Sequence, residues 1–262
     1  MNTVWRPGVA LMNRLRYPRK FALISVLFIL PLALVLALLI QEMNMRVVFA
    51  QKERVGTQYL RPVRLLFAHA LQNGALAHAY LDGGAAFKPS LDEQQRQIDR
   101  DMQELAAHDQ RFGDELGTTA LFDTLQMRWR ALKQQAPGDS AASDARHALL
   151  IADIRALIAQ IGDASNLILD PDLDSFYLMD MELRHIPEAA DLLSQALVLG
   201  KGVSTRGALT PEERGRLIVL DGLLRSNIAK TSRAIEVVFQ VNSAGQLRTR
   251  LMPASHRQLR YS

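Results

Sequence analysis

Asp170, Asp172 and Asp174 alternate along the chain and form the most distinctive group of potential ligands in the sequence. Alternating carboxylates are typical of a calcium-binding loop, which also requires glycine at its sixth position and a bidentate glutamate at its twelfth. Counted from Asp170, those two positions hold Ser175 and Met181. The spacing therefore excludes a calcium loop.

Two other roles fit this acidic stretch. An aspartate that precedes a helix accepts hydrogen bonds from the free amides of the first turn, and proline is well tolerated at the first helical position. We therefore expect Asp170-Pro171 to open a helix, with the acids complementing the positive end of its dipole. The alternative is a polar ligand site at a helix junction, formed by Asp172, Asp174 and Tyr177.

Arg61 and Arg64 are a second group that could bind a ligand. A guanidinium presents paired donors to a carboxylate or nitrate, so these residues are candidates for binding a small anion. An ordinary surface role is the alternative, because arginine is mostly exposed in proteins. The full set of candidate ligand-binding residues is Arg61, Arg64, Asp172, Asp174 and Tyr177.

No catalytic or metal-binding pattern is present in the sequence. Its six histidines lack the i,i+4 pairing of a helical zinc site, and there is no HExxH stretch. The absence of cysteine excludes disulfides, thiolate metal ligands and thiol catalysis. There is also no phosphate-binding glycine loop and no nucleophile elbow. We expect no metal, no cofactor and no enzymatic activity, and we expect Tyr59 and His69 to pack or to face solvent.

Turn signals divide the chain after residue 40 into six helical segments. The expected segments span residues 41–81, 90–108, 118–135, 143–168, 170–200 and 210 onward. Thr210 and Glu213 have the spacing of a capping box at the start of the last one. Proline removes a helical hydrogen bond, so Pro62 should kink or interrupt the first segment, and Pro187 should produce a kink that faces solvent.

Three of these segments repeat apolar residues at intervals of three and four. The series include Leu150, Ile154, Leu157 and Ile161 in the fourth segment, Leu183, Ile186, Ala190, Leu193 and Leu197 in the fifth, and Leu217, Leu220, Leu224 and Ile228 in the sixth. A repeat of about 3.5 residues keeps one face of each helix against a partner helix. We therefore predict an all-α fold, in which an N-terminal transmembrane helix precedes an elongated antiparallel helical bundle.

Residues 21–40, FALISVLFILPLALVLALLI, contain no charged side chain. As a helix they would be about 30 Å long, which matches the hydrocarbon core of a bilayer. Fifteen of the twenty are Leu, Ile, Phe or Val, and each favours insertion by about 0.3–0.6 kcal/mol. The total of about 5–9 kcal/mol exceeds what the single Pro31 can offset. The sequence therefore predicts a transmembrane helix.

The flanks of this segment predict its orientation. Residues 1–20 carry five cations and no acid, whereas Gln41 and Glu42 follow the apolar segment directly. Positive flanks remain in the cytoplasm, so residues 1–20 should form a cytoplasmic head and residues 41–241 an exported region. A cleaved signal peptide is the alternative, but its apolar core usually has about 7–15 residues and a small-x-small site directly after it.

The net charge of +4 comes from the two ends of the chain. Residues 1–20 and 242–262 hold nine of the 31 Lys and Arg and none of the 27 acids. The body, residues 21–241, is therefore acidic and lacks the basic stripe of a nucleic-acid-binding protein. We expect no nucleic-acid partner.

The layout resembles a known family. A basic head and a membrane helix, followed by ERVGTQY at residues 53–59 and LQNG at residues 71–74, are similar to the start of bacterial transmembrane chemoreceptor sensor regions. The run NLILDPDLDSFYLMD at residues 166–180 resembles one that recurs in helical periplasmic regions of methyl-accepting chemotaxis proteins and related sensors. The similarity covers residues 20–240, and only the Asp-Pro-Asp run is specific.

Together with the single apolar segment, this resemblance implies a single-pass protein of the bacterial inner (plasma) membrane, with its helical sensor domain in the periplasm. It also implies a homodimer that binds a small solute and transmits helix displacement through the bilayer. Such receptors have a second membrane helix and a cytoplasmic signalling hairpin, which do not follow here. We therefore expect residues 242–262 to be the basic polar tail of a truncated chain.

The expected function is that of the membrane-anchored sensor region of a methyl-accepting chemotaxis-type transducer. Its expected partners are the lipid bilayer, a second copy and a small solute. One alternative is the sensor half of a histidine kinase or of a cyclic-dinucleotide enzyme. Another is an anchored coiled-coil scaffold that binds no ligand.

Overall fold

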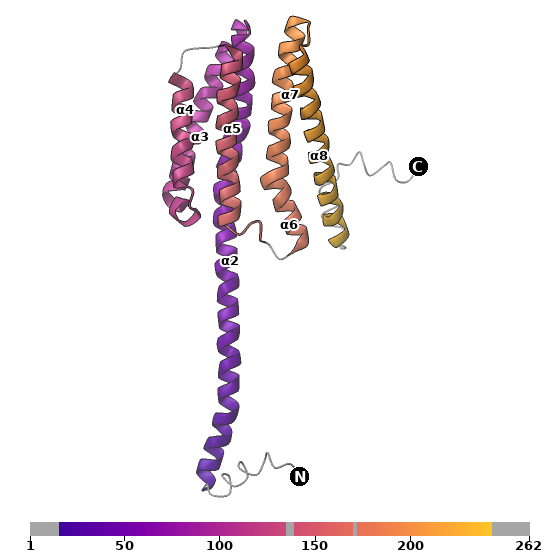
Figure 1. Ribbon diagram of the computed structural model, residues 1–262. Helices are drawn as coiled ribbons and strands as arrows, with labels where there is room; N and C mark the ends of the chain where they lie inside the picture. The colour runs from indigo at the N-terminus through magenta and orange to yellow at the C-terminus, as the bar shows by residue number, and fades with distance from the viewer. Residues whose placement is uncertain (1–15, 135–138, 170–171, 243–262) are drawn as a thin grey trace, which may run out of the picture. The chain divides into compact units, whose positions relative to one another are not determined.

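The computed structural model describes residues 16–134, 139–169 and 172–242, and all regular structure in these ranges is helical (Figure 1). The helices are α2 (Tyr17–Leu81), α3 (Lys88–Leu116), α4 (Thr119–Gln134), α5 (Ser140–Ala164), α6 (Leu173–Asp180), α7 (Ile186–Arg206) and α8 (Pro211–Val241). A short 3-10 helix, Ala85–Phe87, precedes α3, and a π-helical segment, Met181–His185, joins α6 to α7. The predicted all-α fold is confirmed. The chain forms two compact units, one ending at Gln51 and the other beginning at Lys52.

In the first unit, the regular structure is the part of α2 that runs to Gln51. The most apolar 18-residue window of α2 has a mean hydropathy of 3.1, and none of it is buried. Phe21, Leu27 and Phe28 are 70%, 69% and 73% exposed. Exposure of so large an apolar surface on one helix is unfavourable in water. This helix is therefore long and apolar enough to cross a membrane, a property that a signal sequence shares.

In the second unit, α2, α3, α4 and α5 share one hydrophobic core. Its fully buried side chains include Tyr59, Leu66, Ile98, Leu105, Leu125, Leu150, Ile154 and Leu157. Each buried aliphatic side chain contributes about 1.5–3 kcal/mol, so this core fixes how the four helices pack. The apolar series predicted for α5 is confirmed, because Leu150, Ile154, Leu157 and Ile161 are all 0% exposed.

The apolar series of the next segment has a different environment. Leu183 is buried, but Ile186, Leu193 and Leu197 of α7 are 55%, 57% and 53% exposed. Met179 and Ala190 of the same series pack against the core, so the described helices cover only part of this apolar face. Within one chain, the prediction that this series packs against a partner helix is therefore met only at Met179, Leu183 and Ala190.

Helices α7 and α8 lie side by side (Figure 1). The buried Asn227 of α8 donates hydrogen bonds to the backbone oxygen of His185, at 3.2 Å, and to Glu188 Oε2, at 2.9 Å. The capping box predicted at the start of α8 is confirmed. Thr210 Oγ1 accepts from the Glu213 amide at 3.2 Å, and Glu213 Oε2 accepts from the Thr210 amide at 3.0 Å.

Several helix ends differ from those expected. Helix α3 continues to Leu116 rather than 108, and α7 continues to Arg206 rather than 200. Gly117 and Gly207 end these helices with φ of +63° and +68°, a left-handed conformation that glycine adopts at little cost. The glycines within α7 do not end it. The expected opening at Asp170-Pro171 lies outside the described residues.

The interruption predicted at Pro62 and the exposure predicted for Pro187 are both wrong, whereas a kink at Pro62 stays a prediction. Helix α2 continues through Pro62, which is buried, so this proline does not interrupt the helix. Pro187 is buried rather than facing solvent, and it is the second residue after the π-helical segment Met181–His185. A proline ring collides with the carbonyl one turn earlier in a regular α-helix. In the π segment the Ile186 amide donates to the Met181 carbonyl, and this wider turn leaves more room before the proline ring.

Candidate functional site

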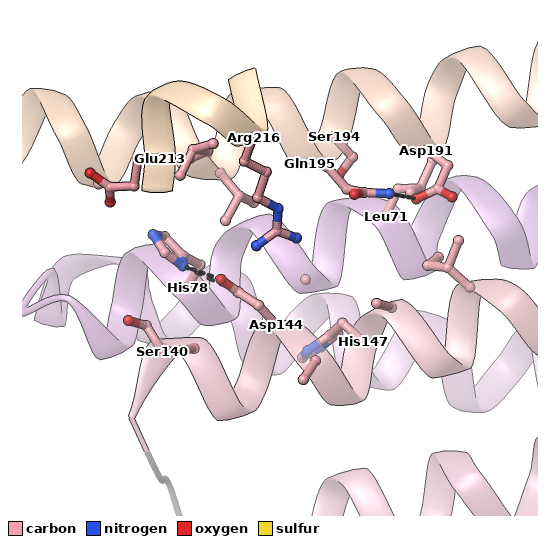
Figure 2. A pocket seen from close by; sticks show the side chains of 18 of the residues that line it. Leu71, His78, Ser140, Asp144, His147, Asp191, Ser194, Gln195, Glu213 and Arg216 are labelled. Atoms are coloured by element: carbon pink, nitrogen blue, oxygen red, sulfur yellow. Dashed lines mark hydrogen bonds and ion pairs between the residues drawn. The ribbon is translucent and has the colours of Figure 1, made fainter. Parts of the chain in front are cut away.

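A pocket of about 410 Å³ lies in the second unit, lined by α2, α5, α7 and α8 (Figure 2). Its volume falls within the range of about 300–1,000 Å³ that is usual for small-molecule sites. Its polar lining includes His78, Asp144, His147, Asp191, Glu213 and Arg216. Its apolar lining includes Leu71, Ile151, Val198 and Leu199.

Helical spacing brings these side chains to the pocket. On α5, Asp144, His147 and Ile151 are separated by three and four residues and therefore lie on one face of the helix. On α2, Gly74 leaves room for the ring of His147, because a Cβ at this position would lie 3.3 Å from His147 Cδ2. The missing side chain lets α2 and α5 approach closely behind the pocket.

His78 lies between two carboxylates. Its Nδ1 is 3.0 Å from Asp144 Oδ2, and its Nε2 is 3.1 Å from Asp82 Oδ2. The second contact is close enough for an ion pair, although it is not aligned as a hydrogen bond. Burial raises the pKa of the Asp144 carboxyl, and the adjacent His78 partly offsets this effect. One imidazole between two acids leaves this part of the pocket negatively charged.

His147 forms the buried back wall. Its Nδ1 is 2.9 Å from the Ser143 carbonyl oxygen, and its Nε2 is 2.9 Å from Asn73 Oδ1. Burial lowers the pKa of this histidine, although the Ser143 carbonyl and the charge of Asp144 act in the opposite direction. The neutral imidazole is therefore favoured near pH 7.

The facing wall comes from α7 and α8. Asp191 of α7 accepts from Arg155 Nη1 at 3.0 Å and from Gln195 Nε2 at 3.1 Å. On α8, the exposed Arg216 directs its guanidinium toward the wall that carries His78 and Asp144 (Figure 2). Opposed charges therefore face one another across the pocket.

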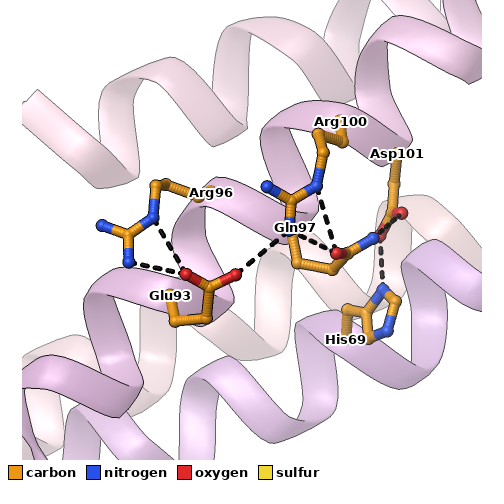
Figure 3. A network of polar contacts seen from close by, with 6 residues as sticks. All are labelled: His69, Glu93, Arg96, Gln97, Arg100 and Asp101. Carbon is orange, nitrogen blue, oxygen red and sulfur yellow. Dashed lines mark hydrogen bonds and ion pairs between the residues drawn. The ribbon is translucent and has the colours of Figure 1, made fainter.

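A second polar cluster lies outside the pocket, where α2 meets α3 (Figure 3). His69 Nδ1 is 2.5 Å from Asp101 Oδ2, and Gln97 Nε2 donates to Asp101 Oδ1 at 3.0 Å. Glu93 accepts from Arg96 and Arg100 on the exposed side of α3. Because Asp101 is buried and both of its oxygens are occupied, this cluster has a structural role in joining the two helices.

Tyr59 forms a third polar contact within the core. Its Oη donates to Asp109 Oδ1 at 2.7 Å, and Thr118 Oγ1 donates to the same oxygen at 2.8 Å. Burial raises the pKa of the Tyr59 phenol well above its usual value. The expectation that Tyr59 and His69 pack in the protein is therefore met, and both also form hydrogen bonds.

The predicted arginines do not line the pocket. Arg61 is exposed on α2. Arg64 Nη1 forms an ion pair of 2.6 Å with Glu182 Oε1 in the π-helical segment. An anion that bound Arg64 would therefore compete with Glu182, and the anion-binding role of both arginines stays a prediction.

The predicted acidic residues lie at the start of α6, also away from the pocket. Asp172 is the N-cap residue of α6, without a capping hydrogen bond from its side chain. Asp174 accepts from the Ser175 amide at 2.9 Å and from Asn242 Nδ2 at 3.3 Å. The ring of Tyr177 packs edge-on against Phe176, with centroids 5.4 Å apart. Their proposed ligand site stays a prediction.

Sequence analysis missed the residues that do meet at the pocket. His78 and Asp144 are 66 positions apart, and neither belongs to a recognisable motif. The available signal was that polar side chains on α5 recur four and three residues apart beside its apolar face, as Ser140, Asp144 and His147 do. Only the packing of α2 against α5 shows that they share a cavity.

Within the described residues, no group of three or more His, Asp or Glu is placed to hold a metal ion. What the pocket offers is a concave, partly apolar surface with charges of both signs, which suits the binding of a small molecule. No protein-family model matches the chain, and neither any curated protein nor any solved structure proves similar to it.

Proposed function

We propose that this chain is the membrane-anchored helical sensor region of a bacterial methyl-accepting chemotaxis-type transducer, which detects a small extracytoplasmic solute. The observation that carries the proposal is that α2 both lines the pocket, through Leu71, Gly74 and His78, and contains the apolar segment 21–40. The Asp-Pro-Asp run, which resembles that of chemoreceptor sensor regions, supports the choice of family.

The proposed mechanism is a shift between two packings of the helices around the pocket. A ligand shifts such an equilibrium only as far as it binds one packing more tightly than the other. Here it would contact α2 and α5 on one side and α7 and α8 on the other. A change in their separation would move α2, the helix that we propose continues into the membrane.

A second copy of the chain is the proposed partner of α7. Ile186, Leu193 and Leu197 form an exposed apolar series on this helix, with the spacing that packs against another helix. Cross-linking in native membranes should give a dimer. Substitution of Leu193 and Leu197 by Glu should abolish it, whereas Asp123→Lys on the exposed face of α4 should leave it unchanged. A persistent monomer in the unsubstituted protein would contradict this arrangement.

The membrane topology can be tested directly, because the chain has no cysteine of its own. Single cysteines would be placed at Met127, which is 62% exposed on α4, and at Thr3 in the basic head. In intact spheroplasts, an impermeant maleimide should label Met127→Cys. It should label Thr3→Cys only after permeabilisation. Labelling in the reverse order, or a mature protein that lacks residues 21–40, would refute the proposed anchor and orientation.

Two other functions would fit the same architecture, and each can be distinguished from a chemotaxis-type sensor by one observation. The sensor half of a histidine kinase or of a cyclic-dinucleotide enzyme would show the same topology and ligand binding. It would differ in the output module, and sequencing of the reading frame beyond Ser262 would identify that module. An anchored scaffold would show the topology without ligand binding, so the absence of any thermal stabilisation by small solutes favours it.

A further inference from the structure

We infer that the pocket binds a small organic cation, with a primary ammonium group placed against Asp144 and an apolar body between Leu71, Ile151 and Val198. This inference rests on the proposed sensory function and names the class of solute. No residue of the predicted anion-binding set takes part. Three features of the pocket carry the argument.

The first feature is the pair of carboxylates on His78. Asp144 and Asp82 contact opposite nitrogens of the same imidazole, at 3.0 and 3.1 Å. Two carboxylates share this one imidazole, which can carry at most one positive charge. The group is therefore anionic in either state of His78. A cation is the ligand that neutralises it.

The second feature is the excess of acids around the pocket. Among the described residues that line it, four carry a carboxylate, Asp144, Asp191, Glu212 and Glu213, and one, Arg216, is a Lys or Arg. Asp191 is matched by Arg155, which lies behind it at 3.0 Å. Asp144 and Glu212 still outnumber Arg216. An anionic ligand at Arg216 would have to approach all of these carboxylates, so like-charge repulsion opposes it.

The third feature is the partial burial of Asp144. Burial makes the ionised form of this carboxyl less favourable, which raises its pKa. An ammonium within hydrogen-bond distance would stabilise that ionised form. The apolar walls beside it would meanwhile remove the body of the ligand from water. An amine with an aromatic or aliphatic body satisfies both requirements, and the volume of about 410 Å³ accommodates it.

Arg216 has a specific place in this inference. Its guanidinium points across the pocket toward Asp144 and His78, without an ion pair to either of them (Figure 2). An ammonium bound at Asp144 would lie opposite the Arg216 guanidinium, and the two positive charges would repel each other. Binding should therefore displace Arg216, and with it the first turns of α8. Removal of the arginine charge should strengthen binding of the cation.

The test uses the full chain in lipid nanodiscs and three probes of the same shape. They are 2-phenylethylammonium, the neutral 2-phenylethanol and the anion phenylacetate, titrated calorimetrically at pH 7 and low salt. We expect 2-phenylethylammonium to bind at least about tenfold more tightly than either of the others, because one charge pair in a partly buried site is worth this much.

Substitutions that should change the affinity in opposite directions make the test specific. Asp144→Asn and Glu212→Gln should each weaken binding of 2-phenylethylammonium, the first by about tenfold or more and the second by about twofold to threefold. Arg216→Gln should strengthen it by about threefold or more. Asp123→Asn, which removes an exposed acid of α4 outside the pocket, should have no effect. Glu212 and Arg216 are exposed, so their variants should fold even if Asp144→Asn does not.

Each outcome decides the inference. Equal affinity for the three probes, preference for phenylacetate, weaker binding in Arg216→Gln or no binding of 2-phenylethylammonium would each overturn the cation assignment. Binding of phenylacetate alone would leave the proposed sensor intact and change only its solute. Failure of the proposed function would appear separately, in the cysteine-labelling pattern, which does not depend on any ligand.

Discussion

Asn73 Oδ1 lies 2.9 Å from His147 Nε2, and this contact joins α2 to α5 inside the protein. Both residues are buried, and Asn73 Nδ2 has no hydrogen-bond partner among the described residues. A protonated His147 donates from Nε2 to Asn73 Oδ1 and from Nδ1 to the Ser143 carbonyl. A neutral ring that keeps its proton on Nδ1 needs a donor at Nε2, which the Asn73 amide supplies once it is rotated by half a turn.

The two protonation states of His147 predict a loss of stability at mildly acidic pH. Because burial lowers the pKa of His147, the unfolded chain binds this proton more readily than the folded protein does. The contribution of His147 to stability is therefore fully present above its usual value of 6.5. It is lost as pH falls from there toward the lower pKa of the folded state. Thermal melts should show a fall in Tm between pH 7 and 5.5 that His147→Gln reduces.

Asp144 provides the internal control for this experiment. Its folded pKa is raised, so its contribution is present below its usual value of 3.8 and is lost as pH rises through the raised value. Its effect therefore has the opposite sign to that of His147. In Asp144→Asn the fall in Tm should become steeper in the acidic range just above pH 3.8, where this carboxyl takes up its proton. A fall that is the same in the unsubstituted protein and in His147→Gln would contradict the role given to His147.

The close packing of α2 against the end of α5 predicts that a side chain at Gly56 destabilises the protein. A Cβ at this position would lie 2.2 Å from Ser165 Oγ and 2.3 Å from Ser165 Cβ. Ser165 cannot easily move away, because it is fully buried and its hydroxyl donates to the Ile161 carbonyl at 2.6 Å. Gly56→Ala should therefore lower the free energy of unfolding by about 1–3 kcal/mol.

The matched control for this substitution is Gly215→Ala. Gly215 lies within α8, and a Cβ there would meet nothing within 4 Å. Alanine at such a position favours the helix by about 0.5–1 kcal/mol. Denaturant unfolding should thus move in opposite directions for the two glycines. A Gly56→Ala variant as stable as Gly215→Ala would show that the two helices are farther apart.

The contact of Tyr59 with Asp109 predicts unequal effects of removing either partner. Tyr59→Phe leaves the Thr118 hydrogen bond to Asp109 in place and should cost about 0.5–1.5 kcal/mol. Asp109→Ala leaves two buried hydroxyls without an acceptor and should cost about 2–4 kcal/mol. Equilibrium unfolding in urea measures both. Similar costs for the two variants would mean that Thr118 finds another partner.

Local patterns predicted what depends on neighbours in sequence. The capping box of Thr210 and Glu213, the apolar series of α5 and the apolar segment of α2 all follow from residues within one or a few turns. The pocket does not, because His78 and Asp144 meet only through the packing of two helices. The same reason explains α7, where the repeat predicts an apolar face and cannot say which helix covers it.

The predicted site illustrates a second limit. Arg64 was identified by its ability to bind an anion, and it is paired with Glu182 of the same chain. Sequence shows a charge but not the partner that folding provides. This ion pair is more than half exposed on the arginine side, so Arg64→Gln should change the stability by less than about 1 kcal/mol. A larger loss in thermal melts would indicate a role beyond this surface ion pair.

The apolar segment of α2 predicts how many charges membrane insertion tolerates. Its insertion is favoured by about 5–9 kcal/mol, and one arginine near the bilayer centre costs about 2.5–3.5 kcal/mol. Replacing Leu30 by Arg should therefore leave the chain in the membrane. Replacing both Leu30 and Leu34 costs about 6–8 kcal/mol, including the lost leucines, and should release much of the chain. The measurement is the fraction that sediments with membranes after an alkaline carbonate wash. Alanine at the same two positions removes apolar surface without adding charge, and this control should stay in the pellet. If the doubly charged variant also remains there, the segment 21–40 is not what anchors the protein.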